Sequence, residues 1–252
     1  NSSKRLIYIV PYVYTEHIQF TMTKAMKNAK QTIRIGGACG FWGDSSLGTQ
    51  QLLKAPDLDY ITFDYLAELT LAIMAGMRMT NPEHGYALDF VELMKKAWPV
   101  DSKKGVRMIA NAGGLNPQGC AKALAEAFAT SEGMAPKIAV VAGDDAQATL
   151  GKLAAQAPLQ CMQTGKPAPP FFLTANAYLG AFPIAAALDA GADIVIAGRV
   201  VDSAMVLGAL VGKLLFSFMK FSTDAVKTFA GMNEGARRQA EMQMLIQNIL
   251  LK

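Results

Sequence analysis

The sequence of 252 residues has only two histidines and three cysteines, and this scarcity argues against several kinds of site. Neither His17 nor His84 follows a predicted strand, so a serine or cysteine nucleophile would have no histidine base. Cys39, Cys120 and Cys161 are odd in number and widely spaced, which argues against a disulfide framework and a structural zinc site. Free cysteines are typical of a reducing compartment, so we expect a cytoplasmic protein.

Long apolar runs and blocks of like charge are also missing. The sequence has no stretch of about 20 uninterrupted apolar residues, and its most apolar candidate, residues 205–219, contains Lys213. We therefore expect no membrane span and interpret this segment as a buried or interfacial helix. The 24 basic and 20 acidic residues give a formal net charge of +4 and are scattered along the chain, so no nucleic-acid partner is expected.

From Thr32 onward the sequence repeats one unit: an apolar β-branched run, a polar or glycine-rich turn, and a stretch with helical spacing. The predicted strands are residues 32–38, 58–65, 105–114, 137–145, 171–180 and 193–202. Apolar residues at intervals of three and four predict helices at 68–79, 87–98, 120–132, 146–156 and 183–192. This alternation predicts a three-layer, Rossmann-like α/β fold, with a largely parallel sheet and helices on both faces. A partial (β/α) barrel is the alternative.

The ends of the chain differ in character from the repeated units. We expect residues 1–30 to be an N-terminal extension of uncertain status, 31–210 the α/β domain, and 211–252 a divergent helical C-terminal segment. The last part of that segment, residues 234–252, has the pattern of an amphipathic helix. Such a helix either packs on its own domain or mediates self-association, so a homo-oligomer remains open.

Polar side chains follow each predicted strand. In a parallel sheet these positions share one edge, and that edge binds the ligand in such folds. We predict that carboxylates at this edge carry out acid–base catalysis, namely Asp64, Glu68, Asp144 and Asp202. The predicted substrate-binding residues are Asp44, Asn111, Gly113, Gly114, Asn116, Asn176, Arg199 and Ser203. Taken singly, several of these residues are equally well explained as helix caps, as is Asp145.

The glycine-rich turns have some features of anion-binding loops. Residues 111–119, NAGGLNPQG, combine two glycines with Pro117 at the predicted start of a helix, an arrangement that can turn free amides toward an anion. Neither this turn nor residues 34–44, RIGGACGFWGD, matches a P-loop or a dinucleotide fingerprint. The cofactor therefore stays unassigned. Magnesium is one alternative, because clustered carboxylates suit a hard cation, but no metal ligands are assigned.

Four segments resemble the acyclic terpene utilisation family, the AtuA-like proteins. They are IRIGGACGFWGDS (33–45), LDYITFDYLAELTLAIMA (58–75), NAGGLNPQGCAKAL (111–124) and NAYLGAFPIAAALDAGADIVIAGRVVDSA (176–204). The resemblance covers about residues 32–210 and implies a role in the breakdown of acyclic terpenes such as citronellol and geraniol, by a route through geranyl-CoA. Family members usually continue well past GRVVDSA, so the comparison also implies a truncated chain or a mispredicted gene product.

These observations predict an enzyme that acts on a small molecule, with an acyl-CoA thioester or another anionic compound as substrate. The anionic part of that substrate is expected to meet Arg199 and the amides of residues 111–117. The alternative is a non-catalytic subunit that binds an acyl-CoA or acts as a scaffold for a carboxylase. The missing histidine base favours this alternative, and the density of carboxylates argues against it.

Overall fold

The structure is a computed structural model that describes residues 6–9, 32–101, 104–129, 135–169 and 171–221. The strands are β1 (Leu6–Ile9), β2 (Ile35–Cys39), β3 (Tyr60–Phe63), β4 (Arg107–Ala110), β5 (Ile138–Val141) and β6 (Ile194–Ala197). The helices are α1 (Leu47–Leu52), α2 (Glu68–Thr80), α3 (Leu88–Asp101), α4 (Pro117–Ala129), α5 (Gln147–Ala154), α6 (Phe182–Asp189) and α7 (Ala204–Phe221). Each strand from β2 onward is followed by one or two helices, which confirms the α/β class.

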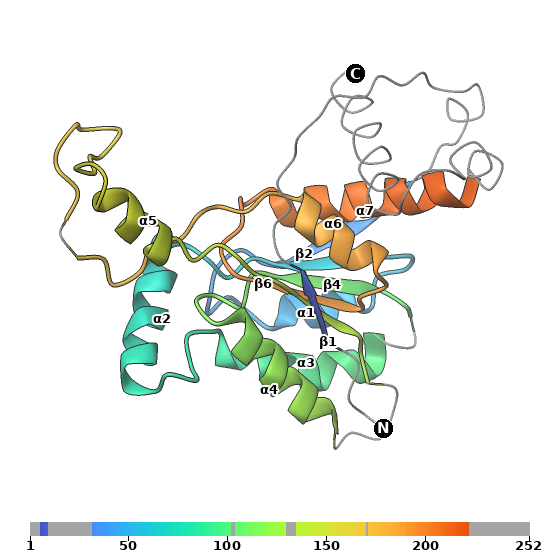
Figure 1. Cartoon of the computed structure of the whole chain (residues 1–252). Coiled ribbons are helices and arrows are strands. Elements are labelled where there is room, and N and C mark those ends of the chain that lie inside the picture. The colour runs from blue at the N-terminus through green and yellow to red at the C-terminus, as the bar shows by residue number, and fades with distance from the viewer. Residues whose placement is uncertain (1–5, 10–31, 102–103, 130–134, 170, 222–252) are drawn as a thin grey trace.

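The strands form one parallel sheet in the order β1-β5-β6-β4-β3-β2 (Figure 1). The sheet is open, with β1 and β2 at its edges, so the described residues form no barrel. Phe63 lies opposite Ala110, and Ala110 lies opposite Ile196. The segments that follow β3, β4 and β6 therefore leave the sheet at the same edge. Strand β1 falls within residues 1–30 and pairs with β5.

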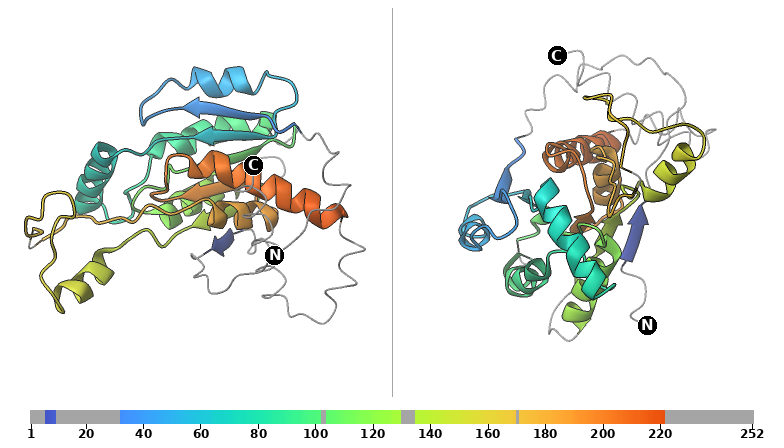
Figure 2. Two further views of the ribbon diagram at one scale, coloured as in Figure 1. Left: turned by 90° about the horizontal axis from the view of Figure 1, so that it is seen from above. Right: turned by 90° about the vertical axis from the view of Figure 1, so that its left-hand side faces the viewer.

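Helices cover both faces of the sheet (Figure 2). Side chains of α3 and α4 pack with Phe63, Met108 and Val140 in one core cluster. Side chains of α6 and α7 pack with Ile109 and Val195 in a second cluster on the other face. All four residues of each of the strands β3, β5 and β6 are buried. This explains why the strands show no alternation of apolar and polar residues, and Thr62 in β3 is the one polar residue among them.

The predicted strand at 171–180 is wrong. This segment is irregular and makes only isolated bridges, one between Asp145 and Asn176 and one between Leu179 and Val200. Its apolar residues are not buried in the sheet, since Phe171 is 75% exposed. An apolar run forms a strand only when a neighbouring strand is available to pair with it. In the described sheet no strand pairs with residues 171–180.

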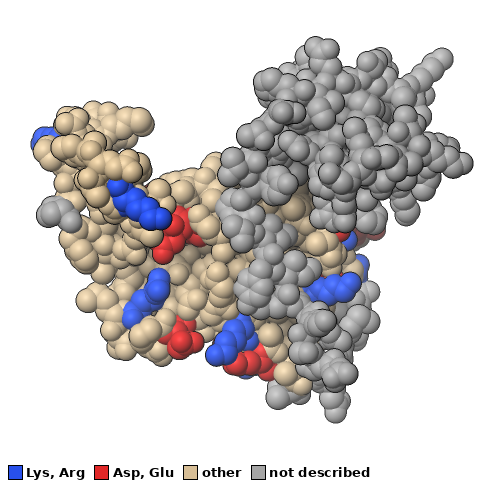
Figure 3. Space-filling view, in the orientation of Figure 1, with Lys and Arg blue, Asp and Glu red and all other residues tan. Residues whose placement is uncertain are grey.

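Helices α2 and α5 extend beyond the edge at which the strands end (Figure 1). Helix α5 has no buried residue, and the chain from residue 146 to residue 188 contains only two charged residues, Lys152 and Lys166. The part of the molecule around α5, on the left in Figure 3, accordingly shows a largely uncharged surface.

Helix α7 runs without a break from residue 204 to residue 221, so the boundary expected at residue 210 falls inside it. It packs on α6, and Lys213 forms an ion pair of 2.7 Å with Asp59. The predicted amphipathic helix at 234–252 lies outside the described residues.

Candidate functional site

The site lies where two neighbouring strands send their connections to opposite faces of the sheet. Strand β4 continues into α4 on one face, whereas its neighbour β6 continues into α7 on the other. Open α/β sheets bind ligands in the crevice at such a switch point, beyond the carboxyl ends of the strands. The residues just after these two strands include Asn111 and Arg199, which are 0% and 3% exposed. Buried polar side chains at this point are a strong indication of a specific site.

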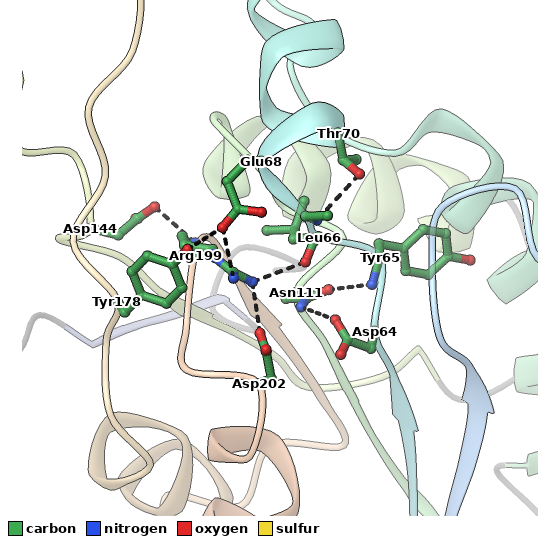
Figure 4. Close-up of polar contacts among 11 residues, drawn as sticks. Asp64, Tyr65, Leu66, Glu68, Thr70, Asn111, Asp144, Tyr178, Arg199 and Asp202 are labelled. Carbon is green, nitrogen blue, oxygen red and sulfur yellow. Dashed lines mark hydrogen bonds and ion pairs between the residues drawn. The ribbon is translucent and has the colours of Figure 1, made fainter. Parts of the chain in front are cut away.

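Arg199 is the centre of the cluster (Figure 4). Its Nη1 atom donates a hydrogen bond of 2.9 Å to the Leu66 carbonyl oxygen and lies 3.1 Å from Oδ1 of Asp202. Its Nη2 atom lies 3.8 Å from Oε1 of Glu68, and its guanidinium carbon lies 4.1 Å from the centre of the Tyr178 ring. The Nε atom is buried and has no hydrogen-bond partner among the described residues. The β3, β6 and 171–180 segments therefore meet on one guanidinium.

Asp144 holds the chain at Arg199 in place. Its Oδ2 atom accepts hydrogen bonds from the backbone amide of Arg199 (2.9 Å) and from Nδ2 of Asn176 (2.8 Å). A Cβ atom on Gly198 would lie 2.6 Å from both carboxylate oxygens, so only glycine permits this approach. Burial raises the pKa of Asp144, although the two hydrogen bonds oppose the shift. This carboxylate is 4% exposed and serves mainly to position Arg199.

Asn111 fixes the loop that supplies the Leu66 carbonyl. Its Oδ1 atom accepts a hydrogen bond of 2.7 Å from the Tyr65 amide, and its Nδ2 atom donates one of 2.7 Å to Oδ1 of Asp64. Both bonds join the end of β4 to the end of β3. The predicted residues Asp64 and Asn111 thus lie together, and the Asn111 side chain is bound by Asp64 and by the Tyr65 amide.

Glu68 and Asp202 are the carboxylates of the cluster that solvent reaches. Their side chains are 80% and 72% exposed, whereas Arg199 beside them is buried. The Tyr178 hydroxyl donates a hydrogen bond of 2.5 Å to Oε1 of Glu68. This bond, the Glu68 backbone amide and the charge of Arg199 lower the pKa of Glu68 despite slight desolvation. These contacts favour the ionised form of Glu68 and make it a weaker base than an unperturbed glutamate.

The charge of Arg199 is already balanced inside the protein. Burial alone would lower the pKa of Arg199, but Tyr178, Asp202 and Glu68 outweigh it and raise that pKa. Two carboxylates within 4 Å of one guanidinium leave no surplus positive charge. An anionic ligand at this site must therefore displace one of these carboxylates or bind beside it.

The glycine-rich turn after β4 packs closely against the end of β6 and bonds to backbone carbonyls. The Gly113 amide donates to the Ala197 carbonyl, and the Gly114 amide donates to the Asn111 carbonyl. A Cβ atom on Gly113 would lie 2.6 Å from the Ala197 oxygen, and Gly114 has a φ of 51°. Because these amides are paired within the chain, the geometry does not favour the predicted anion-binding role.

Asn116 caps a helix. Its Oδ1 atom accepts a hydrogen bond of 2.9 Å from the Gly119 amide in the first turn of α4, and Pro117 occupies the first helical position. Its Nδ2 atom donates to the carbonyls of Glu83 and His84. All polar atoms of this side chain are thus used by the protein itself.

Three further predicted or weighed residues serve local structure or lie away from Arg199. Asp44 closes the turn after β2 by accepting hydrogen bonds from the Gly40 and Ser45 amides, which lower its pKa. Asp145 accepts a hydrogen bond of 3.0 Å from the Gln147 amide at the start of α5. Ser203 is exposed and directly precedes α7, where its backbone carbonyl accepts a hydrogen bond from the Leu207 amide.

The described residues contain no group of three or more histidine, cysteine, aspartate or glutamate side chains that is arranged to hold a metal ion. The carboxylates around Arg199 are therefore compensated by a guanidinium and not grouped as a cation site. The magnesium alternative has no support from these residues.

Two residues at the site carried no predicted role. Tyr178 stacks on Arg199 and binds Glu68, and Gly198 makes room for Asp144. Tyr178 comes two positions after Asn176, so the sequence could have placed it at the site through its position in the same connection. The sequence around Gly198 does not show why glycine is needed there. The reason is a contact with Asp144, which lies far away in the sequence.

The sequence model of the family described as "Acyclic terpene utilisation family protein AtuA" matches residues 33–231. The chain belongs to this family. The match runs past residue 210, where the resemblance noted from the sequence was expected to end. Searches of proteins of curated function and of solved structures find no significant match.

Membership of the AtuA family supports a role in acyclic terpene utilisation. None of the described helices is both long enough and apolar enough to cross a bilayer. The longest of them, α7, carries Lys213.

Proposed function

We propose that this AtuA-family protein is an enzyme that acts on an acyl-CoA, or another anionic small molecule, of acyclic terpene catabolism by carboxylate acid–base chemistry. The observation that carries the proposal is the buried guanidinium of Arg199 at the switch point, with two exposed carboxylates against it. A fixed cation can polarise a carbonyl oxygen, and an adjacent carboxylate can accept the proton that becomes acidic as a result.

The predicted catalytic carboxylates take different parts in this proposal. Glu68 and Asp202 are exposed, so a substrate can reach them, and we assign Glu68 as the base because it lies beside the guanidinium of Arg199 and is open to solvent. Asp144 is a positioning residue, since it is buried and binds the Arg199 amide. Asp64 is tied to Asn111 and helps to hold the loop that contacts Arg199.

Geranyl-CoA is the first compound to test. Turnover is followed by mass spectrometry of the thioester, and binding by thermal shift, for the wild type, Glu68→Gln and Asp44→Asn. The Glu68→Gln variant keeps the shape and the contact with Tyr178 but removes the base. It should lower turnover by about 10²- to 10⁴-fold without weakening binding. Asp44 lies in a separate turn, so Asp44→Asn should turn over normally.

The outcomes separate the two functions considered. Stabilisation by CoA thioesters without any product would support the non-catalytic binding subunit and contradict the enzyme. Full turnover by Glu68→Gln would overturn the assigned base. If neither binding nor turnover occurs with any CoA thioester, the proposed substrate class is wrong.

A further inference from the structure

An arm of the chain projects beyond the edge at which the strands end (Figure 2). It comprises residues 147–169 and 171–174 and includes α5. Its base is a short antiparallel pairing, in which the Ala146 amide donates to the Ala175 carbonyl and the Ala177 amide donates to the Asp144 carbonyl. The arm itself makes none of the contacts of Arg199. The inference drawn from it therefore does not depend on the proposed function.

The arm has no core of its own. None of the residues from 147 to 169 is buried, and all are exposed except Leu150, Leu159 and Ala168. Helix α5 has 8 residues, whereas isolated helices shorter than about 12–15 residues are barely stable in water. Ordering a segment costs conformational entropy, which the burial of apolar surface must offset. The arm therefore needs a surface to pack on that the described part of the chain does not provide.

The exposed side chains of the arm are those of an interface. Met162 and Phe171 are 98% and 75% exposed, and Leu153 and Leu173 are 46% and 48% exposed. Segments that stay disordered are typically rich in charge and poor in apolar residues, but the arm contains only two charged residues, both lysines. Depletion of charge together with large apolar side chains is typical of the cores of protein–protein interfaces.

Helix α2 extends this apolar surface. Figure 2 shows α2 and the arm at the same end of the molecule, which faces the viewer in the right-hand view. Leu69, Ile73 and Met79 of α2 are exposed. Stable interfaces use about 20–30 residues of each partner, and the exposed residues of the arm and of α2 together reach that number. This end of the molecule is therefore large enough to form a stable dimer.

We propose that the arm and α2 form the interface of a two-fold homodimer, in which the arm of each copy packs on the arm and α2 of its partner. A two-fold axis brings the same surface of both copies together, so a surface with few charges meets its own kind without strong repulsion. A second copy accompanies every chain that is made, and it can cover a surface that needs a permanent partner. A membrane fits less well, because helices that bind lipid surfaces carry a polar face rich in lysine and arginine.

Sedimentation velocity of the full chain over a series of concentrations tests the proposal. We expect a particle of twice the chain mass of 26.9 kDa. Leu153→Lys/Phe171→Lys places like charges on both sides of the contact and should raise the dimer Kd by about thirty-fold or more. Phe41→Lys/Leu47→Lys is the matched control, because these two side chains have comparable exposure and follow β2, outside the proposed interface. Its Kd should equal that of the wild type.

Hydrogen–deuterium exchange gives a second readout that needs no variant. Amides of α5 and of residues 158–169 should exchange more slowly in the dimer than in the diluted monomer. Amides of β3 and β6 lie in the buried sheet, so their exchange should be the same in both states. The comparison locates the interface on the chain.

Several results would overturn this proposal. A chain that stays monomeric at every concentration would do so, whether its arm is covered by residues outside the described part of the chain or binds added lipid vesicles. A dimer whose arm exchanges as fast as that of the monomer would place the interface elsewhere. An unchanged Kd in Leu153→Lys/Phe171→Lys would also contradict the assigned surface. Circular dichroism of each variant excludes loss of the fold as the cause of weaker association.

Discussion

At the scale of single residues, the site depends on polar groups that are buried and paired. Arg199 and Asp144 are both more than nine-tenths buried, and each is held by groups from distant parts of the chain. Burying such groups costs free energy unless their hydrogen bonds are satisfied. The residues that make room for these contacts therefore matter as much as the charged residues themselves.

Gly198→Ala tests this dependence. The added Cβ would lie 2.6 Å from both oxygens of Asp144, so the carboxylate must move away from the Arg199 amide. We expect a loss of about 1–3 kcal/mol in the free energy of unfolding, measured with urea. In Gly151→Ala the new methyl group meets open space on α5, and stability should stay equal or rise by up to about 1 kcal/mol. Equal effects of the two substitutions would contradict this packing role.

The titration of Asp144 gives a second prediction. Because burial raises its pKa in the folded state, the folded protein binds this proton more tightly than the unfolded chain. Its contribution to stability is therefore fully present below the unfolded pKa, near about pH 4, and is lost as pH rises through the folded pKa. Asp144→Asn keeps an oxygen acceptor but does not titrate.

Urea unfolding at a series of pH values measures this effect. The stability of the wild type relative to Asp144→Asn should decrease as the pH rises above about 4 and then level off. A relative stability that increases over the same interval would mean that Asp144 has a lowered pKa, in conflict with its burial.

At the scale of elements, the sequence predicted the strands better than the connections. The runs in β3, β5 and β6 are apolar at every position except Thr62, because both faces of the sheet are covered. The run at 171–180 has the same composition at its start, but it remains irregular because no described strand lies beside it. The local composition determines the tendency of a segment to form a strand. The topology of the whole sheet determines whether a neighbouring strand is available to pair with it.

Asn116 belongs to this scale, because its role depends on helix α4. Asn116→Ala removes the cap from the Gly119 amide and the links to residues 83 and 84. We expect the free energy of unfolding to fall by about 1–2 kcal/mol, with binding of geranyl-CoA retained. Asp44→Ala is the comparison, since Asp44 also binds two backbone amides but lies in an exposed turn, and its loss should be smaller. Unchanged stability of Asn116→Ala together with lost binding would restore the role predicted from the sequence.

At the scale of the whole molecule, the expected gathering of all six strand ends is only partly realised. Residues that follow β3, β4, β5 and β6, and the 171–180 connection, meet around Arg199. The turn after β2 instead contributes Asp44 to a separate cavity between α1 and α3, the α1–α3 cavity. Sequence reasoning places all six turns at one edge because the strands are parallel. It cannot tell how far apart they lie along that edge, which depends on the strand order.

That strand order also explains why the site lies where it does. Strand β6 is inserted between β4 and β5, so neighbouring connections diverge to opposite faces between β4 and β6. The order of strands in a sheet has no local signal in one sequence, and the site could be predicted only as a set of residues at one edge. Family membership supplies the biological setting, acyclic terpene utilisation, while the cluster suggests the chemistry.

Hydrogen–deuterium exchange with and without geranyl-CoA tests the central claim most directly, because it reports which amides the ligand protects along the whole chain. The account predicts protection of residues 64–68, 176–179 and 199–203, which surround the Arg199 guanidinium, and no protection of residues 44–54. Protection confined to residues 111–119, or to the α1–α3 cavity, would contradict the assignment of the functional site to the switch point.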